Sequence, residues 1–534
     1  MNQEIQISTL QKYSPAASQH LTEMKSAGTE TVQRTEQTIM TQVTTTEQTI
    51  MNNNFTKFVK TLFSTENKIP YAEVAGNGRT EIYPVFSEEM RSAITQVLYK
   101  ETGKAPVKNA IDQIQGTMAA EALYNGEKRT VWVRSAKTSE GMEIDVNNQT
   151  GQCISIKKEG WSIQQPSSSF YRPSSSREMM IPVTGGSWEL FKKHFKTRSE
   201  EDLKLMIGYM SACLRPEGPY AVLVLQGEQG SAKSTTARMI KALIDPSSGI
   251  TRSAPKKEQD LFIAAKNNHL ISFDNLSLIR NDLSDALCRL ATGGSFACRT
   301  LYTNDQELLI ELCKPVLLNG ITDFVTRADL ASRCIMIELE SIPETGRRPE
   351  EQVMDDFYAD LPLMLGVLMD SAVSALNNKD NVRLERMPRM ADVTIWATAA
   401  EEGLKWAPRT FLDAFERNQL NAALNNLSTD SVAIALRNFM FSLEKREWIG
   451  SASELLSELS LRKSGAEHSR SWPDTAAYLS QYLSRMAPNL RKVGIDLDRD
   501  RTSSLVTSVS LSQYFLGLFL SELLHASPER MIKN

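Results

Sequence analysis

The residues best suited to chemistry lie in one short stretch, G-E-Q-G-S-A-K-S, from Gly227 to Ser234. An apolar run, Ala221 to Leu225, precedes this stretch and predicts a strand buried on both faces, and the residues from Thr235 to Ile244 predict a helix directly after it. In such a strand–turn–helix unit, glycines let backbone N–H groups close on phosphate oxygens, and the helix N-terminus adds a positive dipole end. The sequence therefore predicts a phosphate-binding loop.

Two side chains of this stretch have types suited to ATP and Mg²⁺. In a P-loop a lysine reaches the outer phosphates and a Ser or Thr hydroxyl ligates Mg²⁺, and here these roles fall to Lys233 and Ser234. The stretch departs from the usual pattern at Ala232, where a glycine normally precedes the lysine. We expect position 232 to lie at the helix start, where alanine is a good helix former, so that the loop is preserved. The residues predicted to bind the nucleotide are Gly227, Glu228, Gln229, Gly230, Ser231, Ala232, Lys233, Ser234 and Thr235.

Polar side chains follow two later apolar runs, in an order that suits ATP hydrolysis. Leu270–Phe273 ends in Asp274, the arrangement that places an aspartate beside Mg²⁺ in P-loop ATPases. Pro315–Leu318 ends in Asn319, whose side chain suits the orientation of an attacking water. We expect Ser234 and Asp274 to hold the metal together.

Three arginines lie in the same region of the chain. Arg299 follows a Gly-Gly turn, in a strand-like run that reaches Tyr302. Arg327 and Arg333 come after the second of the two runs, and Arg333 stands just before the apolar residues Cys334–Leu339. Their place beside the predicted site makes all three candidates for contacts with phosphate.

The order of these elements resembles motifs A, B, B′ and C of the superfamily-3 helicases. More closely, the segments G-E-Q-G-S-A-K-S-T, T-G-G-S-F-A-C-R-T-L-Y and P-V-L-L-N-G-I look like the poxvirus-type primase-helicase ATPases of phages and bacterial genomic islands. The resemblance covers Arg129 to Glu340. It implies an AAA+-like parallel sheet flanked by helices, a ring-shaped homo-oligomer, most simply a hexamer, and ATP-driven movement on single-stranded or forked DNA.

The resemblance also implies roles for individual residues. Asn275 stands where many such ATPases carry a second acidic residue that polarises the attacking water, so this position brings the hydrolysis rate into question more than nucleotide binding. Arg327 or Arg333 would act as an arginine finger on the neighbouring subunit's nucleotide; the alternative is a salt bridge within the subunit. Arg299 would lie on a hairpin that lines the DNA path; the alternative is an ordinary surface cation.

The rest of the chain divides by composition and periodicity. Helical spacing predicts a pair of helices, one from Ser87 to Lys100 and one after Pro106, and short alternating runs from Arg129 to Ile163 predict a small β unit. An apolar stripe from Leu361 to Leu376 predicts a helix that packs in the core or covers the ATPase. The resemblance implies an α/β protein with an AAA+-like P-loop core, and the sequence adds a small domain before it and a helical lid and a winged-helix-like domain after it. The predicted parts are a Thr/Gln-rich tail over 1–54, a helical and β domain over 55–182, the ATPase over 183–345, the lid over 346–430 and the last domain over 431–534.

Two acidic residues in the N-terminal third could be read as a metal-binding pair. Glu143 and Asp145 alternate in a predicted strand and so share one of its faces. No neighbouring histidine or third carboxylate completes a primase-type site, so we interpret them as solvated strand charges. Arg172, in the serine-rich stretch that follows, is interpreted as exposed.

The last domain has the order helix, helix, hairpin, which is that of a winged helix. Trp448 opens it, and the residues Leu490 to Ile495 predict one strand of the wing. Its local basic side predicts contact with DNA. The basic residues concerned are Arg485, Arg491 and Lys492.

Composition narrows the class of protein. The chain has 534 residues, which suits several domains, and its net charge of −4 gives no overall nucleic-acid signature. Its longest apolar stretches fall short of a membrane span, so we expect a cytoplasmic protein without a membrane partner. The six cysteines show no CxxC pair, and we expect reduced, mostly buried thiols.

These observations favour a DNA-dependent ATPase, most simply a replicative helicase of a phage or genomic island. The alternative is a non-helicase switch, in which nucleotide state controls oligomer assembly, for example in phage defence. A GTPase is disfavoured because the chain has no N-K-x-D motif. Primase activity is disfavoured because no convincing carboxylate set occurs in the N-terminal third.

Overall fold

The computed structural model describes residues 58–511, apart from 77, 250–251, 300–306, 322–323, 429, 463–471 and 501–505. The predicted tail at 1–54 lies outside this part of the chain. Contacts divide the chain into two compact units, with the boundary after Thr130, and each unit is described by itself.

The first unit is a four-stranded sheet, in the order β3-β2-β1-β4, with two helices. Helix α5 packs on β1 and β2, where apolar side chains such as Ile111 and Met118 are buried. The sequence predicts the pair of helices but not the three strands before them. The elements are β1 (Val59–Ser64), β2 (Pro70–Ala75), β3 (Thr80–Pro84), α4 (Glu88–Thr102), α5 (Lys108–Tyr124) and β4 (Glu127–Lys128).

The second unit begins with a small antiparallel sheet, in the order β6-β7-β8-β9. The sequence assigns residues 131–182 to the N-terminal domain, but the structure joins them to the second unit. The reason is that the apolar face of this sheet, including Ile144 and Ile154, shares one core with helix α12 (Glu350–Asn378). The strands are β5 (Val131–Trp132), β6 (Ser135–Lys137), β7 (Gly141–Asp145), β8 (Cys153–Lys157), β9 (Gly160–Gln164) and β10 (Ser169–Phe170).

The centre of the second unit is a parallel sheet in the order β12-β15-β11-β16, which confirms the predicted mixed α/β class. Helices α7 and α8 share the core of one face, and α9, α10 and α11 share the core of the other. The elements are α6 (Leu190–His194), α7 (Glu200–Cys213), β11 (Val222–Gln226), α8 (Lys233–Ile244), α9 (Glu258–Lys266), β12 (Ile271–Leu276), α10 (Asn281–Thr292), β15 (Val316–Gly320), α11 (Ala328–Ala331) and β16 (Cys334–Glu338).

The register of this sheet brings the carboxyl ends of its strands to one edge. In β11, Leu225 lies opposite Asn319 of β15, and Gln226 lies opposite Glu338 of β16. The polar residues at the strand ends are therefore neighbours, although they are far apart in sequence. The bulge in the pairing of β12 with β15 falls between Phe273 and Leu276, where the chain passes through Asp274.

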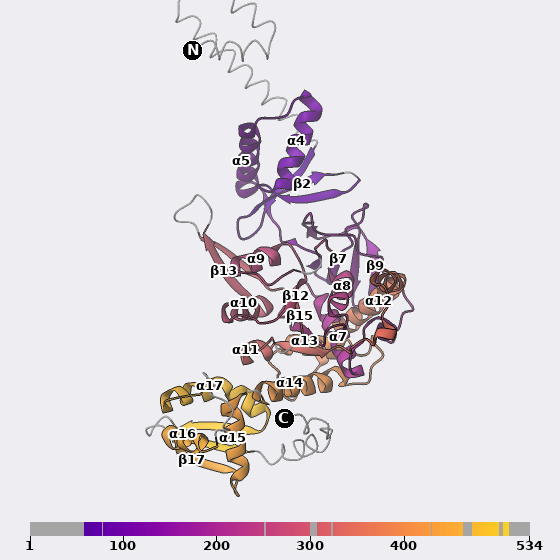
Figure 1. The fold of residues 1–534 in the computed structure, drawn as a ribbon. Coiled ribbons are helices and arrows are strands. Elements are labelled where there is room, and N and C mark those ends of the chain that lie inside the picture. Colours follow the sequence, from indigo (N-terminus) through magenta and orange to yellow (C-terminus); the bar gives the residue numbers. More distant parts are fainter. Residues whose placement is uncertain are drawn as a thin grey trace, which may run out of the picture. The chain divides into compact units, whose positions relative to one another are not determined.

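A two-stranded hairpin leaves this core after α10 (Figure 1). It consists of β13 (Gly294–Arg299) and β14 (Glu307–Leu312), and it contacts α9 and α10. Gly293 has φ 87°, a left-handed value that suits glycine at the turn from helix to strand. The hairpin agrees with the predicted Gly-Gly turn and strand, but the side chain of Arg299 and residue 302 lie outside the described part.

The predicted lid is helical. Its long helix α12 buries the predicted apolar stripe, including Leu361 and Leu368, and is followed by α13 (Ala391–Ala399) and α14 (Thr410–Ser428). The segment Glu350–Asn381 is long and apolar enough to cross a membrane by composition, but 61% of its most apolar window is buried inside the structure. A core helix of this kind passes the same test, so the segment is weak evidence for a membrane span.

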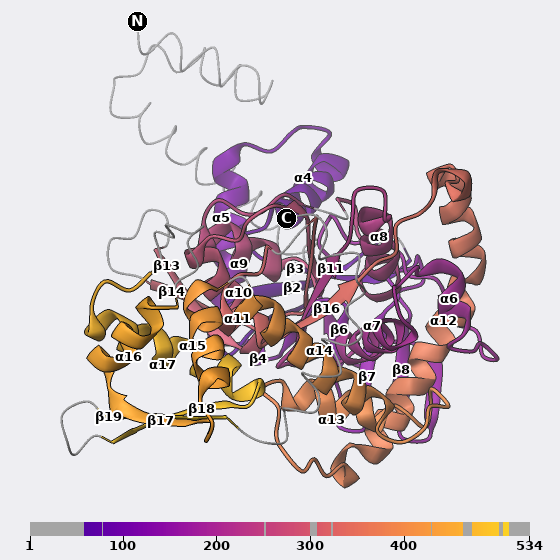
Figure 2. The ribbon, with the colours of Figure 1, turned by 60° about the horizontal axis from the view of Figure 1, so that its bottom comes forward.

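The last part of the second unit places three helices on one side of a small sheet (Figure 2). Strand β19 lies between β17 and β18. The predicted strand at Leu490 to Ile495 is wrong in part, because the helix continues to Lys492 and turns at Gly494, whose φ is 80°. The elements are α15 (Ser431–Ser442), β17 (Glu447–Ser451), α16 (Ala452–Ser460), α17 (Ala476–Lys492), β18 (Ile495–Asp500) and β19 (Val506–Leu511).

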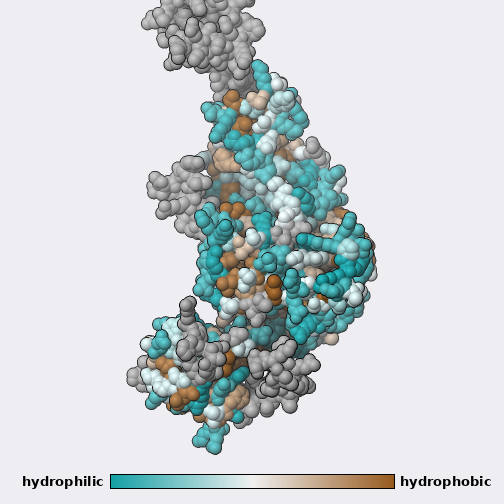
Figure 3. Space-filling model, viewed as in Figure 1, coloured by the Kyte–Doolittle hydropathy of each residue, from teal (hydrophilic) through white to brown (hydrophobic). Residues whose placement is uncertain are grey.

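Hydrophilic residues predominate among the coloured atoms of the face in Figure 3, and the hydrophobic ones form small separate patches. Where the structure describes cysteine side chains, which excludes Cys298, they are free thiols, and all but Cys313 are buried. Within the described ranges no group of three or more His, Cys, Asp or Glu side chains could hold a metal ion.

Candidate functional site

The loop between β11 and α8 lies at the carboxyl edge of the parallel sheet and has an unusual backbone. Gly227 has φ 152° and Gly230 has φ 90°. A Cβ atom on Gly227 would lie 2.7 Å from Ser231 Oγ and 2.9 Å from the carbonyl oxygen of Leu339. Only glycine fits at position 227, because the loop closes so tightly on its neighbours. Ser231 is buried and donates its hydroxyl to the carbonyl of Glu228 (2.9 Å), which holds the loop in shape.

Ala232 does not have the conformation that the sequence predicts. Helix propensity predicts helical angles at position 232, but Ala232 is the N-cap residue, with φ 56° and ψ 29°, and the helix begins at Lys233. A left-handed conformation costs an alanine roughly 1–2 kcal/mol, and glycine would adopt it without that cost. The alanine is therefore accommodated with strain, and the propensity argument for this position is wrong.

Lys233 lies folded against the loop that precedes it. Its ammonium donates to the carbonyl oxygens of Gly227 (2.8 Å) and Glu228 (2.7 Å), and more weakly to Ser231 Oγ (3.3 Å). Partial burial lowers the pKa of Lys233, and the nearby Asp274 carboxylate opposes that shift. The lysine is thus positioned at the mouth of the loop and the N-terminus of α8, where an anionic group is favoured.

Side chains from α8 and from two strand ends meet beside this lysine. Ser234, in the first turn of α8, donates its hydroxyl to Asp274 Oδ1 on β12 at 3.0 Å. The backbone N–H of Asn275 donates to Asn319 Oδ1 on β15 at 2.8 Å. Asn275 has φ 58°, which asparagine tolerates better than most residues. The structure therefore brings together Lys233, Ser234, Asp274, Asn275 and Asn319, as the sequence predicts.

One polar atom at this edge has no protein partner. The Nδ2 atom of Asn319 is buried, and it makes no hydrogen bond within the described residues. A buried amide donor of this kind costs free energy unless something accepts from it, so it fits an oxygen-rich ligand or an ordered water. Ser234 and Asp274 offer two adjacent oxygens, and Mg²⁺ in phosphate sites needs only one or two protein ligands because substrate phosphates supply the rest. The residues present thus fit a magnesium triphosphate.

The two candidate finger arginines are both engaged within the chain. Arg333 is largely buried; it bonds to the carbonyl of Asp329 and pairs with its carboxylate, each at 2.8 Å. Arg327 is more exposed and pairs with Asp285 at 2.8 Å. Arg327 is therefore the better placed of the two to reach another molecule.

A further cation near the loop is not among the residues predicted from the sequence. Arg347 lies after the short turn η1 (Glu344–Gly346), and its Nη2 atom would be 3.1 Å from a Cβ built on Gly230. The neighbouring Arg348 pairs with Asp356, whereas Arg347 makes no ion pair within the described part of the chain. Nothing in the sequence indicates this contact, because Arg347 and Gly230 are distant along the chain and only folding brings them together.

The acidic pair of the small sheet is buried, so the interpretation as solvated strand charges is wrong. Glu143 accepts hydrogen bonds from the backbone N–H groups of Ser167 and Ser168, at 3.0 to 3.1 Å. Asp145 is held by the guanidinium of Arg172, which donates to both carboxylate oxygens at distances from 2.7 to 3.1 Å. Arg172 is itself largely buried, contrary to the expectation that it is exposed. These carboxylates bind protein groups and have little capacity left for a metal.

The three basic residues predicted to contact DNA in the C-terminal domain differ in their exposure. Arg485 and Arg491 are exposed on α17, and Arg491 also pairs with Asp496 at 3.2 Å. Lys492 is partly buried and donates to Gln419 Oε1 of α14 at 2.9 Å. Burial lowers the pKa of Lys492, and the positive charge of Arg389 adds to this effect. Lys492 therefore has a packing contact as well as a charge.

Comparison with protein families connects this chain to DNA replication. Residues 190–414 match the family model described as the actinomycete integrative conjugative element replication protein. Residues 432–513 match the model of the C-terminal domain of the same replication protein. Both matches are to replication proteins of mobile genetic elements, which agrees with the replication and mobile-element parts of the sequence-based interpretation. No curated protein matches the chain.

Comparison with solved structures finds similar chains of low identity. One is the A-form apo structure of the NrS-1 C-terminal region, with 10% identity and a TM-score of 0.39. Another is the apo structure of the NrS-1 C-terminal region (305–718), with 9% identity and a TM-score of 0.39. Each similarity covers 84% of this chain and 96% of the other.

Proposed function

We propose that this chain, which matches the replication proteins of actinomycete integrative conjugative elements, is an ATP hydrolase that acts on DNA. The observation that carries the proposal is the meeting of Lys233, Ser234, Asp274 and Asn319 around a tight glycine loop at the end of four parallel strands. Open parallel sheets bind ligands beyond the carboxyl ends of their strands, which is where this group lies.

Each residue of the group has a role that its contacts support. The loop N–H groups and the ammonium of Lys233 bind the outer phosphates, and the N-terminus of α8 adds a favourable dipole. Ser234 and Asp274 would hold Mg²⁺, which neutralises charge on the phosphates when bound. Asn319 is held at its oxygen by Asn275 N–H and keeps its amide N–H group free to orient the attacking water.

The replication-protein matches support DNA as the partner, and the helicase activity is our proposal. We propose a ring-forming helicase, most simply a hexamer, in which ATP hydrolysis moves the protein along single-stranded or forked DNA. The hairpin β13–β14, with Arg299 at the end of its first strand, would contact phosphate in the DNA path. The last part, with its three helices and small sheet, would add a winged-helix-like contact through Arg485 and Arg491.

A second function has one specific observation in its favour. Asn275 occupies the place of an acidic residue, and its side chain cannot act as a general base at neutral pH. A site that binds ATP well but hydrolyses it slowly suits a switch, in which nucleotide state controls oligomer assembly. The switch hypothesis predicts nucleotide-dependent assembly without strand separation.

Substitution of the loop lysine tests the proposed hydrolase. Lys233→Ala removes the charge that holds the β- and γ-phosphates, so we expect ATP binding to weaken and ATP hydrolysis to be abolished. Lys257→Ala is a matched control, because Lys257 is an exposed lysine at the N-cap of α9 and does not belong to the loop. Hydrolysis is measured as phosphate release from ATP and Mg²⁺ by the full chain.

Two results would count against the proposal. Hydrolysis by Lys233→Ala at the parent rate, in a sample as pure as the control, would show that the activity does not come from this loop. An absence of both ATP binding and hydrolysis in the folded parent chain would remove the proposal altogether. If the parent chain hydrolyses ATP, separation of forked DNA strands favours the helicase, and its absence favours the switch.

A further inference from the structure

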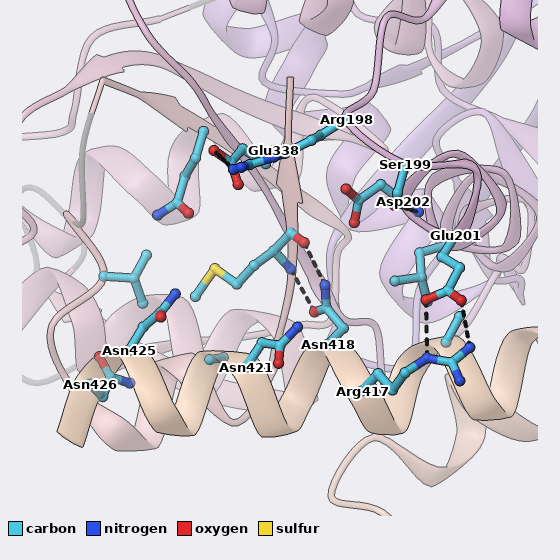
Figure 4. Close-up of a pocket in the computed structure, with 16 residues that line it drawn as sticks. Arg198, Ser199, Glu201, Asp202, Glu338, Arg417, Asn418, Asn421, Asn425 and Asn426 are labelled. Atoms are coloured by element: carbon cyan, nitrogen blue, oxygen red, sulfur yellow. Dashed lines mark hydrogen bonds and ion pairs between the residues drawn. The ribbon is translucent and has the colours of Figure 1, made fainter. Parts of the chain in front are cut away.

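A polar cavity lies at the end of strand β11 that leads into the glycine loop, and Figure 4 shows the side chains that line it. Its volume is about 620 Å³, within the range of pockets that bind small ligands. Gln226, which immediately precedes Gly227, lines the cavity, and so does Glu338, its register partner at the end of β16. The cavity and the loop therefore share one end of strand β11.

One wall of the cavity is a row of asparagines on α14. Asn418, Asn421 and Asn425 extend from the same side of the helix into the cavity (Figure 4). Their spacing of three and four residues is what places them on one helix face. Asn418 is used by the fold, because its side chain accepts from Met336 N–H (3.0 Å) and donates to the Met336 carbonyl (2.5 Å). This closes the free edge of β16.

Three of the other amides that line the cavity are uncommitted. Within the described residues, the side chains of Gln226, Asn421 and Asn425 make no hydrogen bond. Three amides supply both donors and acceptors, and a planar ligand with donors and acceptors along its edge would match them. The sequence does not predict this role for any of the three. Asparagines on a solvent-facing helix, such as Asn421 and Asn425, form no motif that indicates a binding site.

The charges around the cavity largely cancel. Arg198 pairs with Glu338 at 2.5 Å, and Arg417 pairs with Glu201 at 2.7 Å. Asp202 is the remaining carboxylate of the lining, and burial raises its pKa to about 6. An anionic ligand such as phosphate would find no free cation among the described lining residues, so the cavity suits an uncharged polar group.

The position of the cavity on the sheet indicates which uncharged polar group it would bind. Strand β11 lies between β15 and β16, and β15 separates it from β12. Ser234 and Asp274, the proposed Mg²⁺ ligands, lie toward β12, whereas the cavity lies toward β16. A nucleotide with its outer phosphates beside Asp274 would extend its other end across β11 toward the cavity.

We propose that this cavity binds the base of the nucleoside triphosphate, with Asn421, Asn425 and Gln226 reading the donor and acceptor groups on its edge. This inference rests on the proposed function of the loop. Amide side chains pair with adenine through its amino group and a ring nitrogen, and a good pair of this kind contributes ~1–3 kcal/mol of discrimination where it has been measured in DNA. The cavity would thereby set the preference of the site for ATP.

The test is nucleotide binding by the full chain that carries Asn421→Ala and Asn425→Ala together. We expect the dissociation constant for ATP to rise by roughly 5- to 150-fold, the equivalent of one such pair. Affinity for inorganic tripolyphosphate, which has no base, should stay at the parent value. Glu416→Ala is the matched control, because Glu416 is exposed on α14 and does not line the cavity. Thermal unfolding of each variant checks that it is folded.

Further measurements separate the base site from the phosphate site. Lys233→Ala should lose affinity for both ATP and tripolyphosphate, and a parent chain that binds neither contradicts the proposed function itself. If the parent binds ATP and the double asparagine variant binds it equally well, the inference is overturned while the proposed function stands. Loss of affinity for single-stranded DNA without loss for ATP would also overturn it, because the cavity would then hold a base of DNA.

As a second variant, Asn421→Asp removes a donor and should change the ratio of ATP to GTP affinity.

Discussion

Two aspartates that follow apolar residues in strands, Asp145 of β7 and Asp274 of β12, look alike in the sequence and differ in what surrounds them. The carboxylate at the end of β7 is fully used by the protein: Arg172 donates to the two oxygens of Asp145, and both groups are buried. Asp274 accepts one side-chain hydrogen bond, from Ser234, at the open edge of the parallel sheet. The difference shows that a carboxylate is available for chemistry only where the fold leaves its lone pairs unused.

Exchange of each aspartate for asparagine should separate the two roles most strongly. Asp274→Asn should abolish ATP hydrolysis with little change in stability, because it removes the acidic partner of the proposed Mg²⁺. Asp145→Asn should leave hydrolysis by the folded protein near the parent rate. It should lower the free energy of unfolding by roughly 3–5 kcal/mol, since it leaves the buried guanidinium of Arg172 without its counter-charge.

Phosphate release and denaturant unfolding of both variants check this contrast. Full hydrolysis by Asp274→Asn would contradict the assigned role of Asp274. An Asp145→Asn protein as stable as the parent would show that the pair with Arg172 contributes little.

The arginines after β15 extend the comparison to the proposed ring oligomer, in which one of them would reach the neighbouring subunit. We expect Arg327→Ala to lower the hydrolysis rate by about 10³-fold or more, the value of an arginine finger in related phosphoryl-transfer sites. Arg333→Ala should act chiefly on stability, because Arg333 is largely buried against Asp329. Recovery of hydrolysis when Lys233→Ala subunits are mixed with Arg327→Ala subunits would support action in trans. No recovery with either arginine variant would favour salt bridges within the subunit.

Asp202 is a third aspartate, partly buried and without an arginine ion pair among the described residues, and its substitution should have the smallest effect of those considered. Burial raises the pKa of Asp202 to about 6, because the folded protein favours the protonated carboxyl. Below the unfolded pKa near 3.8 the carboxyl is protonated in both states and costs no stability. As the pH rises from there through 6, ionisation favours the unfolded chain and the free energy of unfolding falls. Asp202→Asn should therefore stabilise the protein at pH 7 to 8 by about 1–3 kcal/mol, after allowance for the favourable charge–helix interaction that it removes. The difference in unfolding free energy should shrink toward pH 4, and a difference that is constant with pH would contradict this origin.

The central strands and the loop were predictable because their signals are local. Apolar runs such as Val222–Leu225 identify strands buried on both faces, and each is followed within a residue or two by the polar group that reaches the site. The small sheet at 131–164 and the helix pair at 88–124 are also indicated by their periodicity. The strands at 59–84 are not predicted.

What the sequence does not reveal depends on partners that are distant along the chain. The burial of Asp145 depends on Arg172, and the free amides beside Gln226 come from α14. The left-handed conformation of Ala232 follows from the closure of the whole loop, which outweighs the helix propensity of alanine. Periodicity reports the face on which a residue lies, but it does not report which group meets it there.

The most direct test of the central claim is the rate of ATP hydrolysis by the full chain, measured with no DNA, with single-stranded DNA and with forked DNA. The account predicts that Mg²⁺-dependent hydrolysis rises when DNA is added and that Lys233→Ala shows none under any of the three conditions. A folded parent protein that binds ATP but hydrolyses it at one rate with and without DNA would contradict DNA-dependent hydrolysis and would favour the nucleotide switch.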